Sequence, residues 1–106
     1  MFIIAVINTV EDFFNGINMS ISVVLFKSKS CAACGQVEPI YKSAVELYRD
    51  KIKSETVDIT ENLDAAINNG VMTVPTIIFF KDGKEVKRFA GPVSKEKLEE
   101  TINALG

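Results

Sequence analysis

The two cysteines of this 106-residue chain are the side chains best suited to chemistry, and they lie three positions apart, at Cys31 and Cys34. Two randomly placed cysteines would take this spacing only about 2% of the time, and the spacing is a known redox signature. The flanking sequence predicts a strand-to-helix junction there, so unpaired amides and the helix dipole favour a thiolate at Cys31. We therefore expect Cys31 to attack a disulfide and Cys34 to resolve the mixed disulfide.

Two other uses of the cysteine pair are weaker. A static disulfide across so small a loop would add little stability by chain-entropy reasoning, and such bridges are rare in the cytosol. A structural zinc ion needs four Cys or His ligands, and the chain has two Cys and no His, so we expect no metal site. The absence of His also excludes Cys-His hydrolases and Ser-His-Asp triads.

Apolar runs and turn signals predict the elements that position the cysteine pair. Strands are expected at residues 2–7, 21–26, 56–59, 76–80 and 85–90, and helices just after Thr9, from the cysteine pair to Lys53, over residues 60–69, and from Ser94 to the end. Asp82-Gly83 between the last two strands is typical of a tight hairpin turn. This order predicts an α/β protein of three layers, α/β/α, in which a central mixed five-stranded sheet is flanked by four helices.

The helical segments also show which side chains should be buried. In the long helix, Val37, Tyr41 and similar residues recur at helical spacing. In the helix expected over residues 60–69, Leu63, Ala66 and Ile67 recur on one side. We expect both sets to face the core.

The composition limits the class of protein. Twelve basic and 14 acidic side chains give a net charge of −2, which argues against a nucleic-acid footprint of clustered Lys and Arg. No stretch approaches the ~20 apolar residues of a membrane-spanning helix, and the apolar start of the chain lacks a basic export signal. We expect a single domain over residues 1–106, acting in the cytoplasm as a monomer without cofactor, nucleic-acid or membrane partners.

Several motifs together resemble the thioredoxin family. They are the Cys-x-x-Cys pair at a strand-helix junction, Pro39, Val74-Pro75-Thr76 before a strand, the Lys81-Asp82-Gly83-Lys84 hairpin, and Gly91 followed by Ser94-Lys95. The resemblance spans essentially the whole chain and implies a thioredoxin fold with Pro75 in cis, packed against the cysteine pair. It further implies that the backbone of Val74 hydrogen-bonds an extended substrate segment. The residues implied to rim a shallow apolar groove beside Cys31 are Thr73, Val74, Ala90, Gly91 and Pro92.

The chain departs from the usual pattern of this family at three places. Ser30 and the Ala32-Ala33 pair replace the Trp and Gly-Pro of the common Trp-Cys-Gly-Pro-Cys motif. Leu25 stands where the family often has a buried Asp that assists deprotonation of the second cysteine, and Leu25 cannot take a proton. Cys34 must therefore lose its proton to water or another group, or attack more slowly.

The resemblance implies a thiol-disulfide oxidoreductase that reduces disulfide-containing client proteins and is itself reduced by a separate reductase. A glutaredoxin-like enzyme that uses glutathione is one alternative, because Thr73-Val74-Pro75 also resembles that family. A second alternative is a binding module, in which the groove serves one dedicated partner and the cysteines at most switch that contact. The unusual residues at positions 25 and 30 favour this alternative, and fold alone does not fix function.

Overall fold

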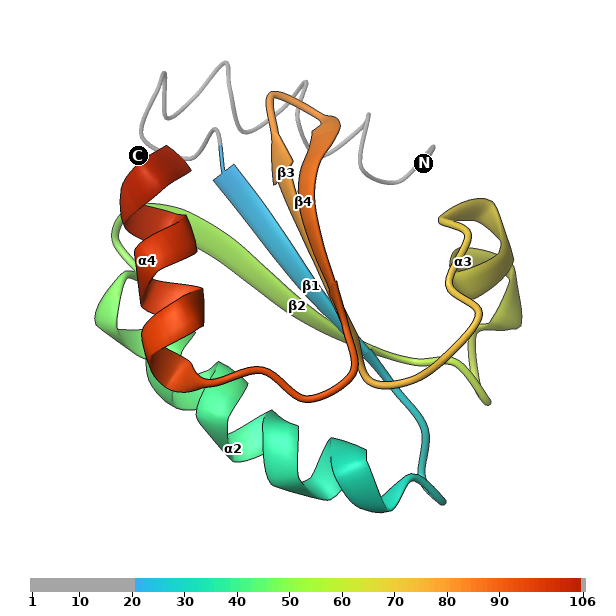
Figure 1. Ribbon diagram of the computed structural model, residues 1–106. Helices are drawn as coiled ribbons and strands as arrows, with labels where there is room; N and C mark the ends of the chain where they lie inside the picture. Colours follow the sequence, from blue (N-terminus) through green and yellow to red (C-terminus); the bar gives the residue numbers. More distant parts are fainter. Residues whose placement is uncertain (1–20, 106) are drawn as a thin grey trace.

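A computed structural model describes residues 21–105 of the chain (Figure 1). Its elements are, in chain order, strand β1 (Ile21–Lys27), helix α2 (Ala32–Leu47), strand β2 (Ile52–Asp58), helix α3 (Leu63–Asn68), strands β3 (Thr76–Lys81) and β4 (Lys84–Ala90), and helix α4 (Lys95–Leu105). The strand expected at residues 2–7 and the helix expected after Thr9 lie outside the described residues. Within residues 21–105, the elements follow the predicted order.

The described strands form one mixed sheet in the order β2-β1-β3-β4. β1 and β2 are parallel, and α2 makes the crossover that a parallel pair requires. β3 is antiparallel to β1 and forms a hairpin with β4. At the turn, Asp82 and Gly83 have φ of 53° and 83°, the left-handed conformation that this dipeptide favours. The mixed sheet and the hairpin are confirmed.

Alternate side chains of the strands cover opposite faces of the sheet, and this alternation produces the three layers. One face packs against α2 and α4, which lie together at the left and bottom of Figure 1, whereas α3 lies at the right. Leu25, Ile77 and Phe79 are at most 1% exposed on the α2 and α4 face. The opposite face carries a second cluster that includes Phe26 and Ile78.

Tyr41 ties α2 to the sheet. Its hydroxyl lies 2.6 Å from the Glu55 carbonyl oxygen and 3.1 Å from that of Val23, so it can donate to either. Burial raises the pKa of the Tyr41 hydroxyl, which therefore stays protonated and able to donate. The helix that begins at the cysteine pair is thereby fixed against β1 and β2.

The prediction that the long helix reaches Lys53 is wrong, because α2 ends at Leu47. A turn follows, in which the amides of Lys51 and Ile52 donate to the Tyr48 carbonyl at 2.8 and 3.1 Å. Ile52 then begins β2 and is 3% exposed. Most of β2 is exposed or half-buried, so its early part carries no apolar run that the sequence could reveal.

The predicted inward face of α3 is wrong for its two large apolar residues. Leu63 and Ile67 are 60% and 64% exposed, whereas Ala66 is 2% exposed. α3 begins only after Asn62, whose side chain accepts from the Ala65 amide at 3.3 Å. Ala65 packs against the second cluster on the opposite face of the sheet, so this short helix contacts the core through its small alanines.

Candidate functional site

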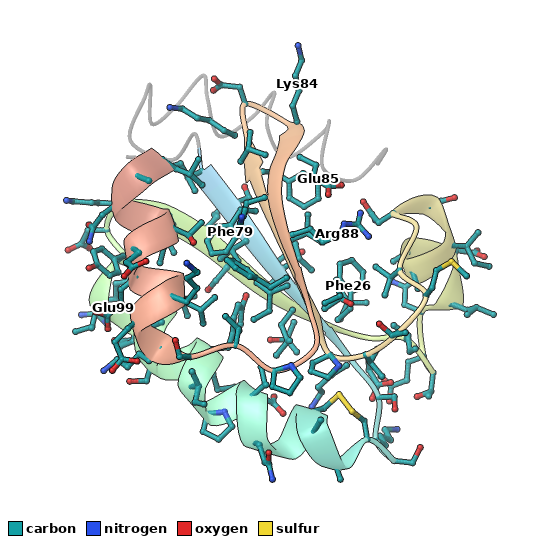
Figure 2. All side chains as sticks on the ribbon, viewed as in Figure 1. Phe26, Phe79, Lys84, Glu85, Arg88 and Glu99 are labelled. Carbon is teal, nitrogen blue, oxygen red and sulfur yellow. A yellow bond between two sulfur atoms is a disulfide. The ribbon has the colours of Figure 1, made fainter. Side chains whose placement is uncertain are left out.

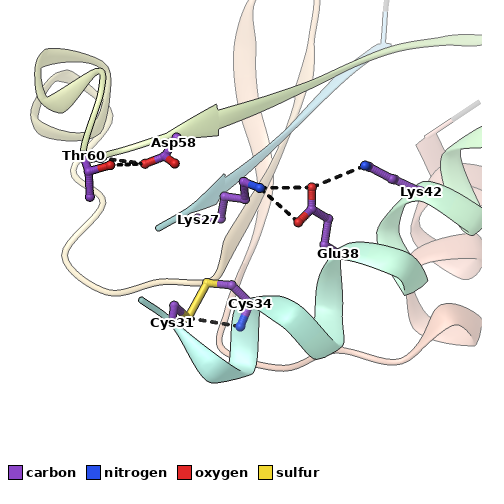
Figure 3. Close-up of polar contacts among 7 residues, drawn as sticks. All are labelled: Lys27, Cys31, Cys34, Glu38, Lys42, Asp58 and Thr60. Atoms are coloured by element: carbon purple, nitrogen blue, oxygen red, sulfur yellow. Dashed lines mark hydrogen bonds and ion pairs between the residues drawn. A yellow bond between two sulfur atoms is a disulfide. The ribbon is translucent and has the colours of Figure 1, made fainter. Parts of the chain in front are cut away.

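The cysteine pair lies at the start of α2, just after the loop that follows β1. Cys31 is the N-cap residue, with an extended backbone (φ −101°, ψ 110°), and Cys34 lies in the first turn. The two residues form a disulfide, with their Cα atoms 5.2 Å apart (Figure 3). Cys34 is 2% exposed, whereas Cys31 is half-buried. Cys31 is therefore the sulfur that a second molecule can reach more easily.

The N-terminus of α2 places positive partial charge next to the Cys31 sulfur. The Cys34 amide donates to Cys31 Sγ at 3.0 Å, and no acidic side chain lies in the first turn of the helix. Both an N–H donor and the helix dipole favour a negatively charged sulfur. These two features favour a thiolate at Cys31 in the reduced protein, and its reactivity stays a prediction.

The backbone before β3 lies against the cysteine pair. The Val74–Pro75 peptide bond is cis, as the family resemblance implied. The Val74 carbonyl oxygen lies 3.7 Å from Cys31 Sγ. On the other side of the proline, the Gly91 amide donates to the Pro75 carbonyl at 2.7 Å. The segment that follows β4 therefore meets the segment that precedes β3 beside Cys31.

The remaining expected groove residues gather at the same junction. Ala90 is the partner of Thr76 in the pairing of β3 with β4. The Thr76 hydroxyl donates to the Thr73 carbonyl at 2.7 Å, which holds the loop just before Val74. Fold topology thus brings together two segments that are far apart in the sequence. Three of the expected rim residues, Thr73, Ala90 and Pro92, are exposed.

Charged side chains of β1 and α2 form a network near the cysteine pair (Figure 3). Lys27 Nζ lies 3.1 and 3.2 Å from the two carboxylate oxygens of Glu38, and Lys42 Nζ lies 3.4 Å from one of them. The hydrogen bond from Lys27 lowers the pKa of Glu38. Glu38 follows Cys34 by four residues, so the two share a face of α2. A paired carboxylate therefore lies one helical turn beyond Cys34.

Leu25 and Lys29 contribute no free charge to this region. Leu25 is fully buried in the core beneath α2, where the family often has an acid. Lys29 Nζ lies 2.7 Å from the Glu61 carboxylate, and both side chains are about two-thirds exposed. This hydrogen bond raises the pKa of Lys29, whose charge is matched by Glu61.

Residues 21–105 contain neither a group of metal ligands nor a membrane-spanning helix. No three His, Cys, Asp or Glu side chains in this part of the chain are grouped closely enough to hold a metal ion. Among the described helices, none has the length and apolar character needed to cross a membrane.

Comparison with known proteins decides the family. The thioredoxin family model matches residues 4–104 of this chain. The chain belongs to the thioredoxin family. Thioredoxin of Ovis aries is 36% identical over 95 residues, which cover 90% of this chain and 89% of the sheep protein. Thioredoxin of Homo sapiens is 41% identical over 83 residues, which cover 78% of this chain and 77% of the human protein.

Solved structures give the same result. The X-ray structure of Fasciola hepatica thioredoxin matches with a TM-score of 0.76 and 32% sequence identity, covering 92% of this chain and 91% of its own. The thioredoxin fold predicted from the sequence is confirmed. With its paired Cys31 and Cys34, this thioredoxin-family protein is a thiol-disulfide oxidoreductase, which acts on disulfide-containing substrates.

Two ion pairs of the described residues were not predicted from the sequence. The Lys27–Glu38 pair joins a strand to a helix across 11 positions, and no local pattern marks such a contact. The second pair joins Arg88 to Glu85 within β4. Arg88 also contacts the segment that follows α3. These contacts could not be predicted from the sequence, because they depend on how β4 and α3 are packed.

Proposed function

We propose that this protein reduces disulfides in client proteins, with Cys31 as the attacking sulfur and Cys34 as the resolving sulfur. The observation that carries this assignment is the 3.0 Å hydrogen bond from the Cys34 amide to Cys31 Sγ at the N-terminus of α2. It favours the thiolate at the more accessible sulfur. Cys34 is 2% exposed, which suits a sulfur that attacks only inside the protein.

The proposed cycle has two exchange steps. The Cys31 thiolate attacks one sulfur of a client disulfide, a Cys31–client bond forms, and the other client sulfur leaves as a thiolate that takes a proton from water. The Cys34 thiolate then attacks Cys31 Sγ, the mixed disulfide breaks, and the client sulfur leaves and is protonated. The client gains two electrons, and the protein is left with the Cys31–Cys34 disulfide.

The client is proposed to bind in extended form at the junction of the two loops beside Cys31. The residues proposed to contact it are Thr73, Val74, Pro75, Ala90 and Gly91. The 3.7 Å separation between Cys31 Sγ and the Val74 carbonyl supports this, because a segment paired with Val74 would carry its disulfide to Cys31. Backbone pairing accepts many client sequences, since it uses no side chain of the client.

A separate reductase is proposed to return the disulfide to the dithiol. We infer that the protein acts as a monomeric single domain in the cytoplasm, where thiols are kept reduced and such a cycle can run toward client reduction. The net charge of −2 supports protein clients over nucleic acids.

Substitution of each cysteine tests the proposed roles. We expect Cys31→Ser to abolish reduction of insulin by dithiothreitol-recycled protein, because the attacking sulfur is lost. We expect Cys34→Ser to trap clients as mixed disulfides through Cys31, since the resolving step is missing. Mass spectrometry of the trapped species identifies the sulfur that holds the client.

Other outcomes would point to the alternative functions. Continued insulin reduction by the Cys31→Ser variant would contradict the assignment of Cys31. Rapid turnover of a small glutathione mixed disulfide, with little insulin reduction, would favour the glutaredoxin-like alternative. Slow reduction of every disulfide, together with tight binding to one protein that survives Cys31→Ser, would favour the binding module.

A further inference from the structure

Arg88 extends from β4 toward the C-terminal end of α3 (Figure 2). Its Nη2 donates to the Asn69 carbonyl at 2.7 Å, and its Nη1 donates to the Gly70 carbonyl at 3.1 Å. Asn69 and Gly70 are the two residues that directly follow α3. The Arg88 guanidinium therefore fastens the segment that leaves α3 to β4.

Glu85 fixes the orientation of this guanidinium. Arg88 Nε and Nη2 donate to the two carboxylate oxygens of Glu85 at 2.7 and 2.8 Å, which is a bidentate pair. The side chains are 30% and 40% exposed. The pairing raises the pKa of Arg88 and lowers that of Glu85, so both remain charged near neutral pH. With both groups charged and bound, the guanidinium has little freedom to turn away from α3.

The loop over residues 71–74 is thereby held at both ends by the same strand. At its start, Arg88 binds the carbonyl of the preceding Gly70. At its end, the Gly91 amide, which directly follows β4, binds the Pro75 carbonyl. Only four residues lie between these two anchors, and the Val74 carbonyl beside Cys31 belongs to them.

We propose that Arg88 is a positioning residue for the client site and that it makes the protein prefer polypeptide disulfides over small ones. This inference rests on the proposed function and extends it to the choice of substrate. A client segment that pairs with Val74 needs residues 71–74 already ordered. Without Arg88, the start of the loop keeps only the hydrogen bond from the Val71 amide to the Ala66 carbonyl at 2.9 Å. The loop is then less ordered before the client binds, and this weakens affinity. A small disulfide that meets only Cys31 has no such requirement.

The test compares a polypeptide disulfide with a small one. In Arg88→Ala we expect the KM for insulin to rise about five- to tenfold, because one loop anchor is lost, with kcat changed by less than about twofold. The kcat/KM for dithiobis-nitrobenzoate should stay within about twofold of the parent value. Arg88→Lys keeps the charge but lacks the planar fork, so its KM for insulin should rise only about two- to threefold.

Arg49→Ala is the matched control. Arg49 also pairs with a Glu three residues away, at 2.8 Å, but it lies beyond the end of α2 that is opposite the cysteine pair. Its side chain and that of Glu46 are 73% and 65% exposed. We expect this variant to match the parent protein with both substrates.

Two results would overturn the role of Arg88. An unchanged KM for insulin would show that client binding does not depend on this anchor. A parallel loss with insulin and dithiobis-nitrobenzoate would show a general structural defect and no substrate preference. If Arg88→Ala does not fold, as judged by its circular dichroism, the same comparison is decided with Arg88→Lys. Failure of the proposed function looks different, because the parent protein itself would then not reduce insulin.

Discussion

Glu38 shows how neighbouring charges shift the pKa of a single residue. Its carboxylate lies between Lys27 and Lys42, and the Glu38 and Lys27 side chains are only 22% and 27% exposed. The hydrogen bond from Lys27 lowers the pKa of Glu38 below its ordinary 4.5. A carboxylate with a lowered pKa in the folded state stabilises the fold above its unfolded pKa, and this stabilisation is lost as the pH falls through the folded value.

Because the pKa of Glu38 is lowered in the folded protein, the effect of Glu38→Gln on stability should depend on pH. At pH 7 the variant should have a free energy of unfolding about 1 kcal/mol lower than the parent, because a partly buried charged hydrogen bond is weakened. The difference should shrink as the pH falls below 4.5, where the parent carboxylate also becomes protonated. Urea unfolding at a series of pH values measures it.

Glu46→Gln serves as the control for this measurement. Its carboxylate also pairs with a basic side chain, but both partners are mostly exposed. Exposed pairs contribute little to stability, so we expect no resolvable change at any pH. A loss in Glu38→Gln that persists undiminished at pH 3 would contradict an origin in the charge of Glu38.

At the scale of single elements, helix α4 begins where the sequence predicts a helix start, and one of its faces is buried. Ser94 Oγ accepts from the Lys97 amide at 3.1 Å, so Ser94 caps the helix that the sequence predicts to start there. Leu98 and Ile102 are 1% and 2% exposed and belong to the cluster shared with α2. The cap therefore stabilises one of the two helices that cover this face of the sheet.

Removal of the cap gives a prediction for the element. Ser94→Ala should lower the free energy of unfolding by about 1 kcal/mol, because the Lys97 amide loses its partner at the helix start. Thermal and urea unfolding of the oxidised protein measure the change. Ser43→Ala provides a contrast, since Ser43 is exposed inside α2 and alanine suits a helix interior. Equal losses in the two variants would argue against a specific capping effect.

The redox potential of the cysteine pair belongs to the whole molecule. It reports the free-energy difference between the dithiol and disulfide forms, to which every group that stabilises either form contributes. The start of α2 favours the thiolate and hence the reduced form. Leu25, which is buried in the core beneath α2, offers no acid.

If the protein is the proposed protein-disulfide reductase, we expect a midpoint potential of about −270 mV. The measurement equilibrates the protein in redox buffers of known potential and labels the free thiols of Cys31 and Cys34. A midpoint potential of about −120 mV would indicate an oxidant or isomerase instead. Failure to form a reversible bridge would favour the binding module.

Much of the fold could be predicted because its signals are local or periodic. The Asp82-Gly83 turn needs only two residues with positive φ, and the Ser94 cap needs only one side chain near an amide. β3 was found as an apolar run because it is buried on both faces. The first part of β2 was missed because an exposed strand carries no such run.

The sequence by itself therefore determined the redox chemistry, through the spacing of Cys31 and Cys34 and their position at a helix start. Only the tertiary structure decided what surrounds them. The contact of Cys31 with Val74, the pairing of Lys27 with Glu38, and the reach of Arg88 to α3 all join separate elements. Such contacts depend on how the elements pack, and no local pattern in a single chain encodes the distance between two packed elements.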